Sequence, residues 1–260
     1  MELIMFKKID VLLLAGGKTK ISLRRFTGKE NKSFIEIGPR HIPMILYIIE
    51  SFKKAKYIDK IIVAGSIEVQ NLIKNLVYLT VPEGPTILDT VKSGISPLKE
   101  KSFIMISTSD IPLVTEKHID NFVEKCIKKP GFDIYYPIVS KEKYLKTYPS
   151  PDLKRTYANF VNGSFTGGNF LMINPKIIRE YSDVIENFIH FRKHPLKMAR
   201  LLGAQITSKY LRGYLSIQDL EKRIPELLGG YRGRAIPSPP QIALDIDKPR
   251  HLKILWENFK

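Results

Sequence analysis

The chain has 260 residues, 43% of them apolar, and a formal net charge of +16. This length and composition suit a folded domain with a large core and exclude an intrinsically disordered chain. A single cysteine, Cys126, excludes an internal disulfide and a cysteine-built zinc site, and it predicts a reducing, cytoplasmic location. No apolar run is long enough to span a bilayer, and no signal-peptide cleavage pattern follows the first apolar stretch.

The excess of lysine and arginine predicts affinity for anions, whether nucleotides, phosphorylated small molecules, nucleic acid or an acidic membrane surface. Charge alone does not choose among these partners. Because no combined basic and aromatic nucleic-acid motif is present, we expect no specific nucleic-acid partner. The composition carries no information on oligomeric state.

Short apolar runs alternate with amphipathic segments over the first half of the chain. The pattern predicts strands at 11–15, 61–64, 76–81 and 103–107, with helices at 43–55, 67–75 and 87–97 and a helix that Thr115 caps and that runs to about residue 128. This alternation predicts an α/β fold with a mostly parallel, doubly wound sheet, in which ligands gather at the carboxyl ends of the strands.

The second half has a different pattern. It predicts short strands at 132–139 and 169–174, separated by a polar, tyrosine-rich loop over 140–162. Residues 183–230 are predicted to be mostly helical, with a capping box that begins at Ser216 and a C-terminal stop at Gly229 and Gly230. A last strand is expected at 242–247, followed by a short helix after Pro249.

A glycine turn follows the first predicted strand, in the stretch IDVLLLAGG from Ile9 to Gly17. Gly16 and Gly17 would let backbone N–H groups approach an anion where a Cβ would intrude, so the stretch predicts a nucleotide site. The alternative is a plain turn. Lys32 precedes the apolar run FIEIG and can reach the same loop. Its alternative role is that of a solvated cation.

Four motifs in a fixed order carry a family resemblance: the LAGG turn, K-x-F-I-x-I-G from Lys32, STSDIPL at 107–113 and DIDKP at 245–249. In this order they resemble the molybdenum-cofactor-guanylyltransferase-like NTP transferase domain. The resemblance implies a Rossmann-like, GT-A type nucleotidyltransferase fold. It also implies transfer of a nucleotide from an NTP to an acceptor, with release of pyrophosphate.

The same resemblance implies a metal site. Asp110 would bind the catalytic Mg²⁺, and Asp247, or in second place Asp245, would share the ion. A carboxylate at the end of a buried strand also fits the place where α/β sheets bind ligands. The alternatives are a turn at Asp110 that Pro112 stabilises and a helix cap at the second site.

The remaining implied roles concern nucleotide and acceptor. Besides the metal-binding Asp110, the resemblance makes Lys18 and Lys32 catalytic. Lys18 stands where the family has an arginine, and Lys20, Arg24 and Arg25 compete with it. The implied nucleotide-binding residues are Leu14, Ala15, Gly16, Gly17, Lys18, Lys32, Pro82, Glu83, Gly84, Thr86 and Asp110. The acceptor side is assigned to Thr166, Gly167, Gly168 and Asn169, although a β-bulge would also explain the two glycines.

We expect a single domain made of an NTP-binding half (8–125), an acceptor and metal half (126–182 and 231–260) and a helical insertion (183–230). The insertion has no counterpart in the smallest family members. Within it, residues 187–212 carry cations and no acidic residue, namely Arg192, Lys193, Lys197, Arg200, Lys209 and Arg212. This run is expected to recruit a phosphorylated or otherwise anionic acceptor, including at an acidic membrane surface. The alternative is a solvated basic face.

Two other functions compete with nucleotide transfer. The D-I-D sequence at 245–247 has the form of the D-x-D motif of a sugar-nucleotide glycosyltransferase, but its place near the end of the chain and the N-terminal LAGG argue against that activity. A non-catalytic protein that senses nucleotides or binds other anions would bind an NTP tightly without turnover. The five histidines lack metal-ligand spacing.

Overall fold

The computed structural model describes residues 8–98, 103–151, 153 and 155–258. Its strands are β1 (Ile9–Leu14), β2 (Glu36–Ile37), β3 (Ile42–Pro43), β4 (Ile58–Gly65), β5 (Leu79–Pro82), β6 (Ile104–Thr108), β7 (Ile134–Ser140), β8 (Ala158–Phe160), β9 (Gly163–Gly167), β10 (Phe170–Ile173) and β11 (Gly233–Pro237). Its α-helices are α1 (Ile21–Thr27), α2 (Met44–Lys54), α3 (Ile67–Ile73), α4 (Ile87–Ile95), α5 (Glu116–Ile127), α6 (Lys141–Thr147), α7 (Pro175–Glu180), α8 (Ser182–Phe191), α9 (Pro195–Leu201), α10 (Ala204–Leu211), α11 (Ile217–Leu227) and α12 (Pro249–Asn258). Two short 3₁₀ turns are η2 (Lys32–Phe34) and η3 (Pro240–Ala243).

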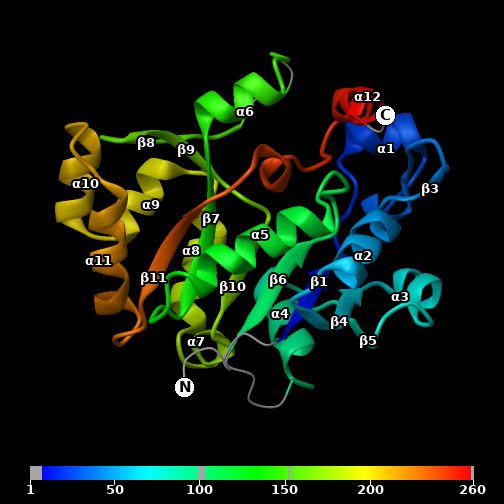
Figure 1. Ribbon diagram of the computed structural model, residues 1–260, viewed down its shortest axis with the longest axis horizontal. Helices are drawn as coiled ribbons and strands as arrows, with labels where there is room; N and C mark the ends of the chain where they lie inside the picture. Colours follow the sequence, from blue (N-terminus) through cyan, green and yellow to red (C-terminus); the bar gives the residue numbers. More distant parts are fainter. Residues whose placement is uncertain (1–7, 99–102, 152, 154, 259–260) are drawn as a thin grey trace.

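One large sheet forms the centre of the molecule (Figure 1). Its strands follow the order β5-β4-β1-β6-β10-β7-β9-β8, and β11 pairs with β7 outside this path. The first four strands are mutually parallel, whereas β10 is antiparallel to both β6 and β7. The predicted α/β class with a Rossmann-like, mostly parallel sheet is confirmed.

Helices cover both faces of this sheet. Val11 and Leu13 of β1 pack on one face into a core shared with α2, α3 and α5, while Leu12 packs on the other face with α4 and α7. A strand buried on both faces is continuously apolar, which explains the run in β1. The β1–β6 register places Leu14 beside Thr108, so both strands end at the same edge of the sheet.

The structure corrects two sequence predictions in the second half. The segment 140–162 is not a plain loop, because Ser140 caps the short helix α6 and residues 158–160 pair with β9. Residues 242–247 are not a strand. The strand of this region is β11, and Pro239 and Pro240 follow it without backbone N–H donors, so the chain enters η3 instead of continuing the ladder.

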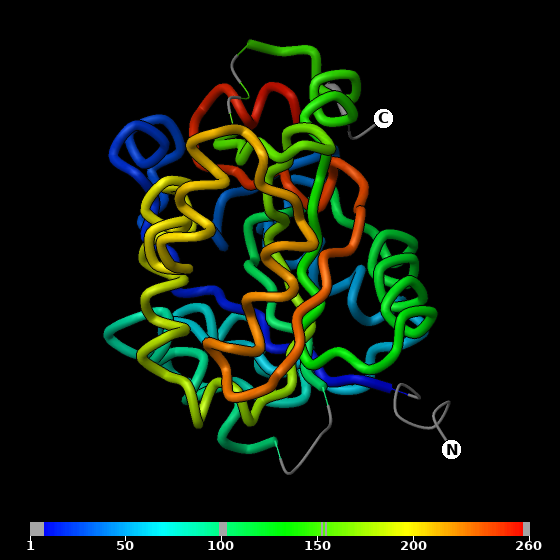
Figure 2. Tube along the Cα trace, turned by 90° about the vertical axis from the view of Figure 1, so that its left-hand side faces the viewer, coloured from blue at the N-terminus to red at the C-terminus, as the bar shows by residue number. Residues whose placement is uncertain are grey.

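Helices α8 to α11 form a layer at one end of the molecule and face the viewer in Figure 2. Their inner side chains build a small separate core from Ala199, Leu202, Ile206 and Leu215, against which Phe160 of β8 packs. The predicted capping box of α11 is present, with the Ser216 hydroxyl accepting from the Asp219 amide at 3.1 Å. Gly229 and Gly230 end this region with φ values of 56° and 97°.

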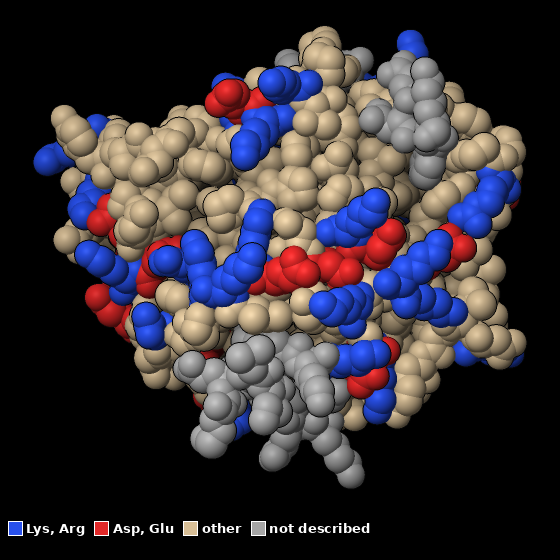
Figure 3. All heavy atoms as spheres, in the orientation of Figure 1, with Lys and Arg blue, Asp and Glu red and all other residues tan. Residues whose placement is uncertain are grey.

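The basic charge is uneven over the surface. Figure 3 shows acidic side chains crossing the middle of the face seen in Figure 1, over α5, with lysine and arginine on both sides. This face is therefore of mixed charge, not a uniformly positive surface. None of the helices in the described part of the chain combines the length and apolar character needed to cross a bilayer.

Candidate active site

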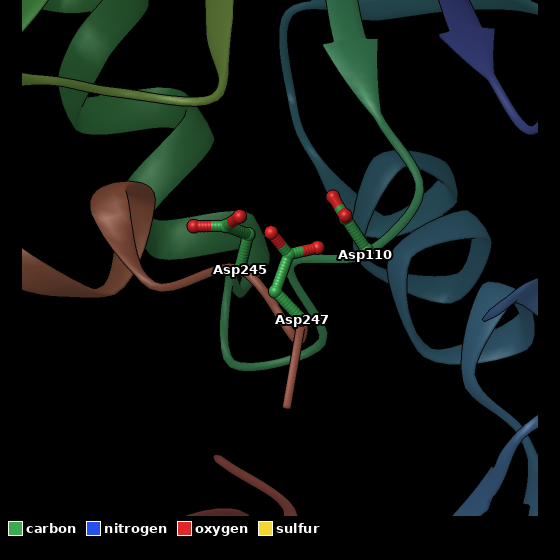
Figure 4. Close-up of side chains that lie close together, drawn as sticks. All are labelled: Asp110, Asp245 and Asp247. Carbon is green, nitrogen blue, oxygen red and sulfur yellow. The ribbon is translucent and has the colours of Figure 1, made fainter. Parts of the chain in front are cut away.

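Three aspartates converge beyond the carboxyl end of β6. Asp110 lies just after that strand, and Asp245 and Asp247 lie on the segment between η3 and α12. Figure 4 shows their carboxylates turned toward one another, with Asp247 between the other two. One oxygen from each carboxylate lies within 4.8 Å of one from each of the others.

The C-terminal segment reaches this position through specific contacts. The backbone N–H of Ile246 donates to the Asp110 carbonyl at 2.9 Å, which ties the two loops together. The Ile246 side chain is fully buried in a core with Leu23 and Ile35 from the N-terminal part. His251 of α12 places Nδ1 3.2 Å from the Asp247 N and 3.0 Å from the Asp245 carbonyl oxygen. Packing and hydrogen bonds therefore orient Asp245 and Asp247, although the segment that carries them is not a strand.

Cations lie among the carboxylates. The Lys32 ammonium pairs with Asp110 at 2.7 Å and also with Asp247, and Lys20 pairs with the other oxygen of Asp247. Burial lowers the pKa of Lys32, but the attraction of Asp110 and Asp247 outweighs burial and holds that pKa above its usual value. Burial raises the pKa of Asp247, whereas Lys32 and Lys20 together hold it well below its usual range.

The aspartates fit a hard metal ion. Asp110 Oδ1 is buried and has no hydrogen-bond partner in the described structure, although its other oxygen is paired with Lys32. Carboxylate oxygens are the ligands that Mg²⁺ prefers, and Mg²⁺ commonly takes one or two of them together with phosphate oxygens. The site can therefore hold a divalent ion between Asp110 and Asp247, with Asp245 beside them.

The glycine turn lies next to Lys32. The side-chain Nδ2 of Asn31 donates to the Ala15 carbonyl at 3.0 Å, and its Oδ1 accepts from the Ser33 backbone N–H at 2.8 Å. These contacts hold η2 against the turn and direct Lys32 to the carboxylates. The backbone carbonyls of Leu14 and Ala15 both accept hydrogen bonds, Leu14 from the Ser109 amide at 3.1 Å and Ala15 from the Asn31 side chain.

Two lysines after the glycine turn have different surroundings. Lys18 is exposed, pairs through its backbone with Asn31, and forms no ion pair within the described structure. Lys20, which the sequence offered only as a competitor, reaches Asp247. The structure thus brings Lys20, and not Lys18, to the carboxylates, and Arg24 pairs with Glu30 away from them.

The loop from Pro82 to Thr86 approaches the glycine turn from β5. A Cβ on Gly16 would lie 1.7 Å from Glu83 Oε2, so the Glu83 carboxylate rests directly on the turn. Gly84 packs closely on α4, where a Cβ would lie 2.5 Å from Asp89 Cβ, and its amide donates to the Thr90 hydroxyl at 2.9 Å. The Thr86 hydroxyl caps α4 by accepting from the Asp89 amide. The predicted nucleotide loop and turn are therefore adjacent.

The segment 166–169 connects the region of Asp110 with the region before Asp245. The Asn169 carboxamide and backbone N–H both donate to the Ile242 carbonyl, at 3.1 and 3.0 Å, and the Asn169 carbonyl accepts from the Thr108 amide at 3.0 Å. A Cβ on Gly168 would lie 2.5 Å from Ile242 Cγ2. Gly168 and Asn169 thus position Asp110 and Asp245, while Thr166 is buried in β9.

Gly167 borders a second group of side chains. A Cβ there would lie 2.0 Å from the hydroxyl of Tyr136, and Arg155 donates to the Gly167 carbonyl at 3.4 Å while pairing with Asp245. Sequence reasoning missed Tyr136, Arg155 and the positioning role of His251, because no motif surrounds them. The role of Lys20 could have been predicted from its position three residues after Gly17.

Comparisons with known proteins show the family of the chain. The model of the MobA-like NTP transferase domain matches residues 11–219. A protein described as a hypothetical transferase from Thermus thermophilus is 29% identical, with a TM-score of 0.79 over 94% of this chain and 99% of that one.

Two more distant structures share the fold. The 4-diphosphocytidyl-2C-methyl-D-erythritol synthase of Anaerococcus prevotii has a TM-score of 0.59 at 10% identity, covering 98% of each chain. A CMP:2-keto-3-deoxy-manno-octonic acid synthetase complexed with CTP has a TM-score of 0.59 at 12% identity, covering 96% of each chain. Comparison with curated protein sequences gives no match. The family model covers most of the chain, and the chain therefore belongs to the MobA-like NTP transferase domain family.

Proposed function

We propose that this protein is a magnesium-dependent nucleotidyltransferase that transfers an NMP from an NTP to an anionic, phosphorylated acceptor and releases pyrophosphate. The observation that carries the proposal is the cluster of Asp110, Asp245 and Asp247 with Lys32 among them. Asp110 and Asp247 beside Lys32 and Lys20 suit a site that must bind a cation and a triphosphate together.

The chain supplies groups for each part of this reaction. The backbone N–H groups of Gly16 and Gly17, with Lys20 and Lys32, would bind the triphosphate. Asp110 and Asp247 would hold Mg²⁺, which when bound neutralises phosphate charge and orients the α-phosphate. An acceptor oxygen attacks the α-phosphorus, the bond to the β-phosphate oxygen breaks, and pyrophosphate leaves with its electron pair. Catalysis is then mainly positioning and charge neutralisation.

The acceptor would enter from the side of Gly167. Tyr136 is 41% exposed there, and its hydroxyl lies against Gly167 next to Arg155. Burial raises the pKa of Tyr136 above its usual value, although the charges of Arg155 and Arg192 act to lower it. A hydroxyl beside the Arg155 guanidinium suits a phosphate or carboxylate. We therefore assign residues 126–182 and 231–260 to the acceptor and metal side and residues 8–125 to the NTP side.

A thermal-shift panel tests this proposal. The four NTPs would be compared with and without Mg²⁺, beginning with CTP and GTP, because the distant structural neighbours include cytidylyl enzymes and the family is named for a guanylyltransferase. One NTP should stabilise the protein only with Mg²⁺, and Asp247→Asn should abolish that metal-dependent part. Stabilisation by sugar nucleotides alone would indicate a glycosyltransferase. Tight NTP binding without pyrophosphate release in the presence of phosphorylated acceptors would indicate a sensor.

A further inference from the structure

An open groove runs along α10 at the end of the molecule that faces the viewer in Figure 2. Its volume is about 620 Å³, and its lining consists of Arg200, Ala204, Thr207, Ser208, Leu211 and Arg212, which we call the basic groove. Four of these residues lie at positions i, i+3, i+4 and i+7 of α10 and so share one helix face. Arg200 of α9 and Arg212 at the end of α10 complete the groove.

The two arginines keep their charge available. Of the neighbouring cations, Lys209 pairs with Asp219 at 2.5 Å and Arg192 donates to the Ile189 carbonyl at 2.5 Å. Arg200 and Arg212 are exposed, and no ion pair between described residues involves either of them. Residues 187–212 also contain no acidic side chain. The acidic side chains of the packed helix α11 are paired with other cations, Asp219 with Lys209, Glu221 with Arg234 and Glu226 with Arg223, so the charge around the groove is positive.

Apolar side chains lie exposed beside these charges. Leu211 is 66% exposed and Tyr214 is 71% exposed, although the inner face of the same helices is already buried around Leu202 and Ile206. Leu211 and Tyr214 are therefore not needed for the small core of the insertion. Cations next to an exposed aliphatic and an exposed aromatic side chain are typical of surfaces that lie on a membrane.

We propose that the basic groove docks the protein on an anionic lipid bilayer. Arg200 and Arg212 bind lipid phosphates, and Leu211 and Tyr214 enter the interfacial layer between headgroups and acyl chains. A bilayer fits better than a nucleic acid, because an aliphatic side chain such as Leu211 gains by entering lipid and gains nothing on a phosphate backbone. Nothing in this proposal depends on nucleotide transfer.

Vesicle co-sedimentation of the full chain tests the proposal. The probes are vesicles of phosphatidylcholine alone and vesicles in which about a third of the lipid is phosphatidylglycerol. The protein should bind only the anionic vesicles, and binding should weaken as salt shortens the range of the charge attraction. Arg200→Gln with Arg212→Gln should reduce the affinity about 25-fold, because each cation near an anionic surface contributes roughly fivefold.

Two further variants sharpen the result. Leu211→Ser with Tyr214→Ser keeps the charge and should also weaken binding, which a purely electrostatic attraction would not show. Lys53→Gln with Lys54→Gln removes the same charge from the exposed end of α2 and should leave binding within about twofold. Circular dichroism and thermal unfolding establish that each variant is folded.

Several results would overturn the proposal. These are equal binding to both vesicle types, no binding to anionic vesicles, an equal loss in the control pair, and unchanged binding in the Leu211 and Tyr214 variant. Displacement from anionic vesicles by single-stranded RNA at equal charge concentration, with RNA binding lost in the Arg200 and Arg212 variant, would reassign the groove to nucleic acid.

Discussion

The two sides of the carboxylate cluster are built by different means. On the nucleotide side, Asp110 and the glycine turn follow buried parallel strands whose ladder fixes their positions. On the other side, Asp245 and Asp247 lie on a segment without ladder bonds, held by the Ile246 amide, His251 and ion pairs. Half of the site thus depends on local sequence pattern, and half depends on tertiary packing.

The largest effect should come from removing a charge of the proposed metal site on either side. Asp110→Asn and Asp247→Asn keep the side-chain size but lose the charge that would hold Mg²⁺. We expect each to lower pyrophosphate release about a thousandfold, as for loss of a main electrostatic contributor. Asp183→Asn, at an exposed position on α8, serves as the matched control and should stay within about twofold of the parent. Near-parental activity in Asp110→Asn would remove that residue from the metal site.

Substitution of the three lysines of the nucleotide side should lower kcat/KM most at Lys32, less at Lys20 and least at Lys18. Lys32→Gln removes the cation shared by two carboxylates and should lower kcat/KM for the NTP about a hundredfold, while Lys20→Gln should lower it about tenfold. Lys18→Gln should change it less than about twofold, because its side chain is exposed and unpaired among the described residues. Steady-state kinetics decide the order, and a loss at Lys18 as large as at Lys32 would contradict the geometry.

Two glycine variants separate positioning from nucleotide contact. In Gly168→Ala the new Cβ would meet Ile242 and Pro137 at 2.5 and 2.8 Å, and neither can move freely. We expect a loss of about 2 kcal/mol in the free energy of unfolding. In Gly16→Ala the clash is with the flexible end of Glu83, so stability should change little while NTP affinity falls. Urea unfolding and NTP titration measure the two effects, and the reverse pattern would contradict this account.

The smallest effect concerns acid stability of the insertion. The Lys209 ammonium and the Ser216 amide and hydroxyl lower the pKa of Asp219 from 3.8 to about 2. Because the folded pKa is depressed, this stabilisation is present above pH 3.8 and is lost as the pH falls toward about 2. Asp219→Asn should reduce stability at neutral pH by about 1 kcal/mol, as for loss of a cap, and flatten the acid dependence. An unchanged slope in this variant would exclude Asp219 as a contributor.

The division between local sequence pattern and tertiary packing also explains which parts of the structure could be predicted from the sequence. The parallel strands and the helices from α2 to α5 were predicted within a few residues, because each has a strong apolar period, and Ser66 and Thr86 also cap α3 and α4. Gly16 and Asp110 directly follow two of these strands, β1 and β6, and Lys32 lies on η2, which the structure brings next to them. The roles assigned to individual residues of that site stay predictions.

What the sequence missed depends on contacts between distant segments. Tyr136 of β7 meets Gly167 through the pairing of β7 with β9, and Arg155 reaches Asp245 across 90 residues of sequence. No local pattern predicts either contact. Residues 242–247 alternate like a strand, but the prolines before them remove the donors that a ladder needs. Lys18 was preferred over Lys20 because it directly follows the glycines, whereas the backbone pairing of Lys18 with Asn31 leaves its side chain in solvent.

The fate of the NTP phosphates tests the proposed nucleotidyl transfer most directly. The preferred NTP, labelled at either the α- or the γ-phosphate, would be incubated with Mg²⁺, the protein and a panel of phosphomonoester acceptors. Attack at the α-phosphorus predicts that the γ label leaves as pyrophosphate and the α label joins the acceptor, and that both products disappear in Asp247→Asn. Recovery of the γ label as inorganic phosphate or on the acceptor would contradict nucleotidyl transfer.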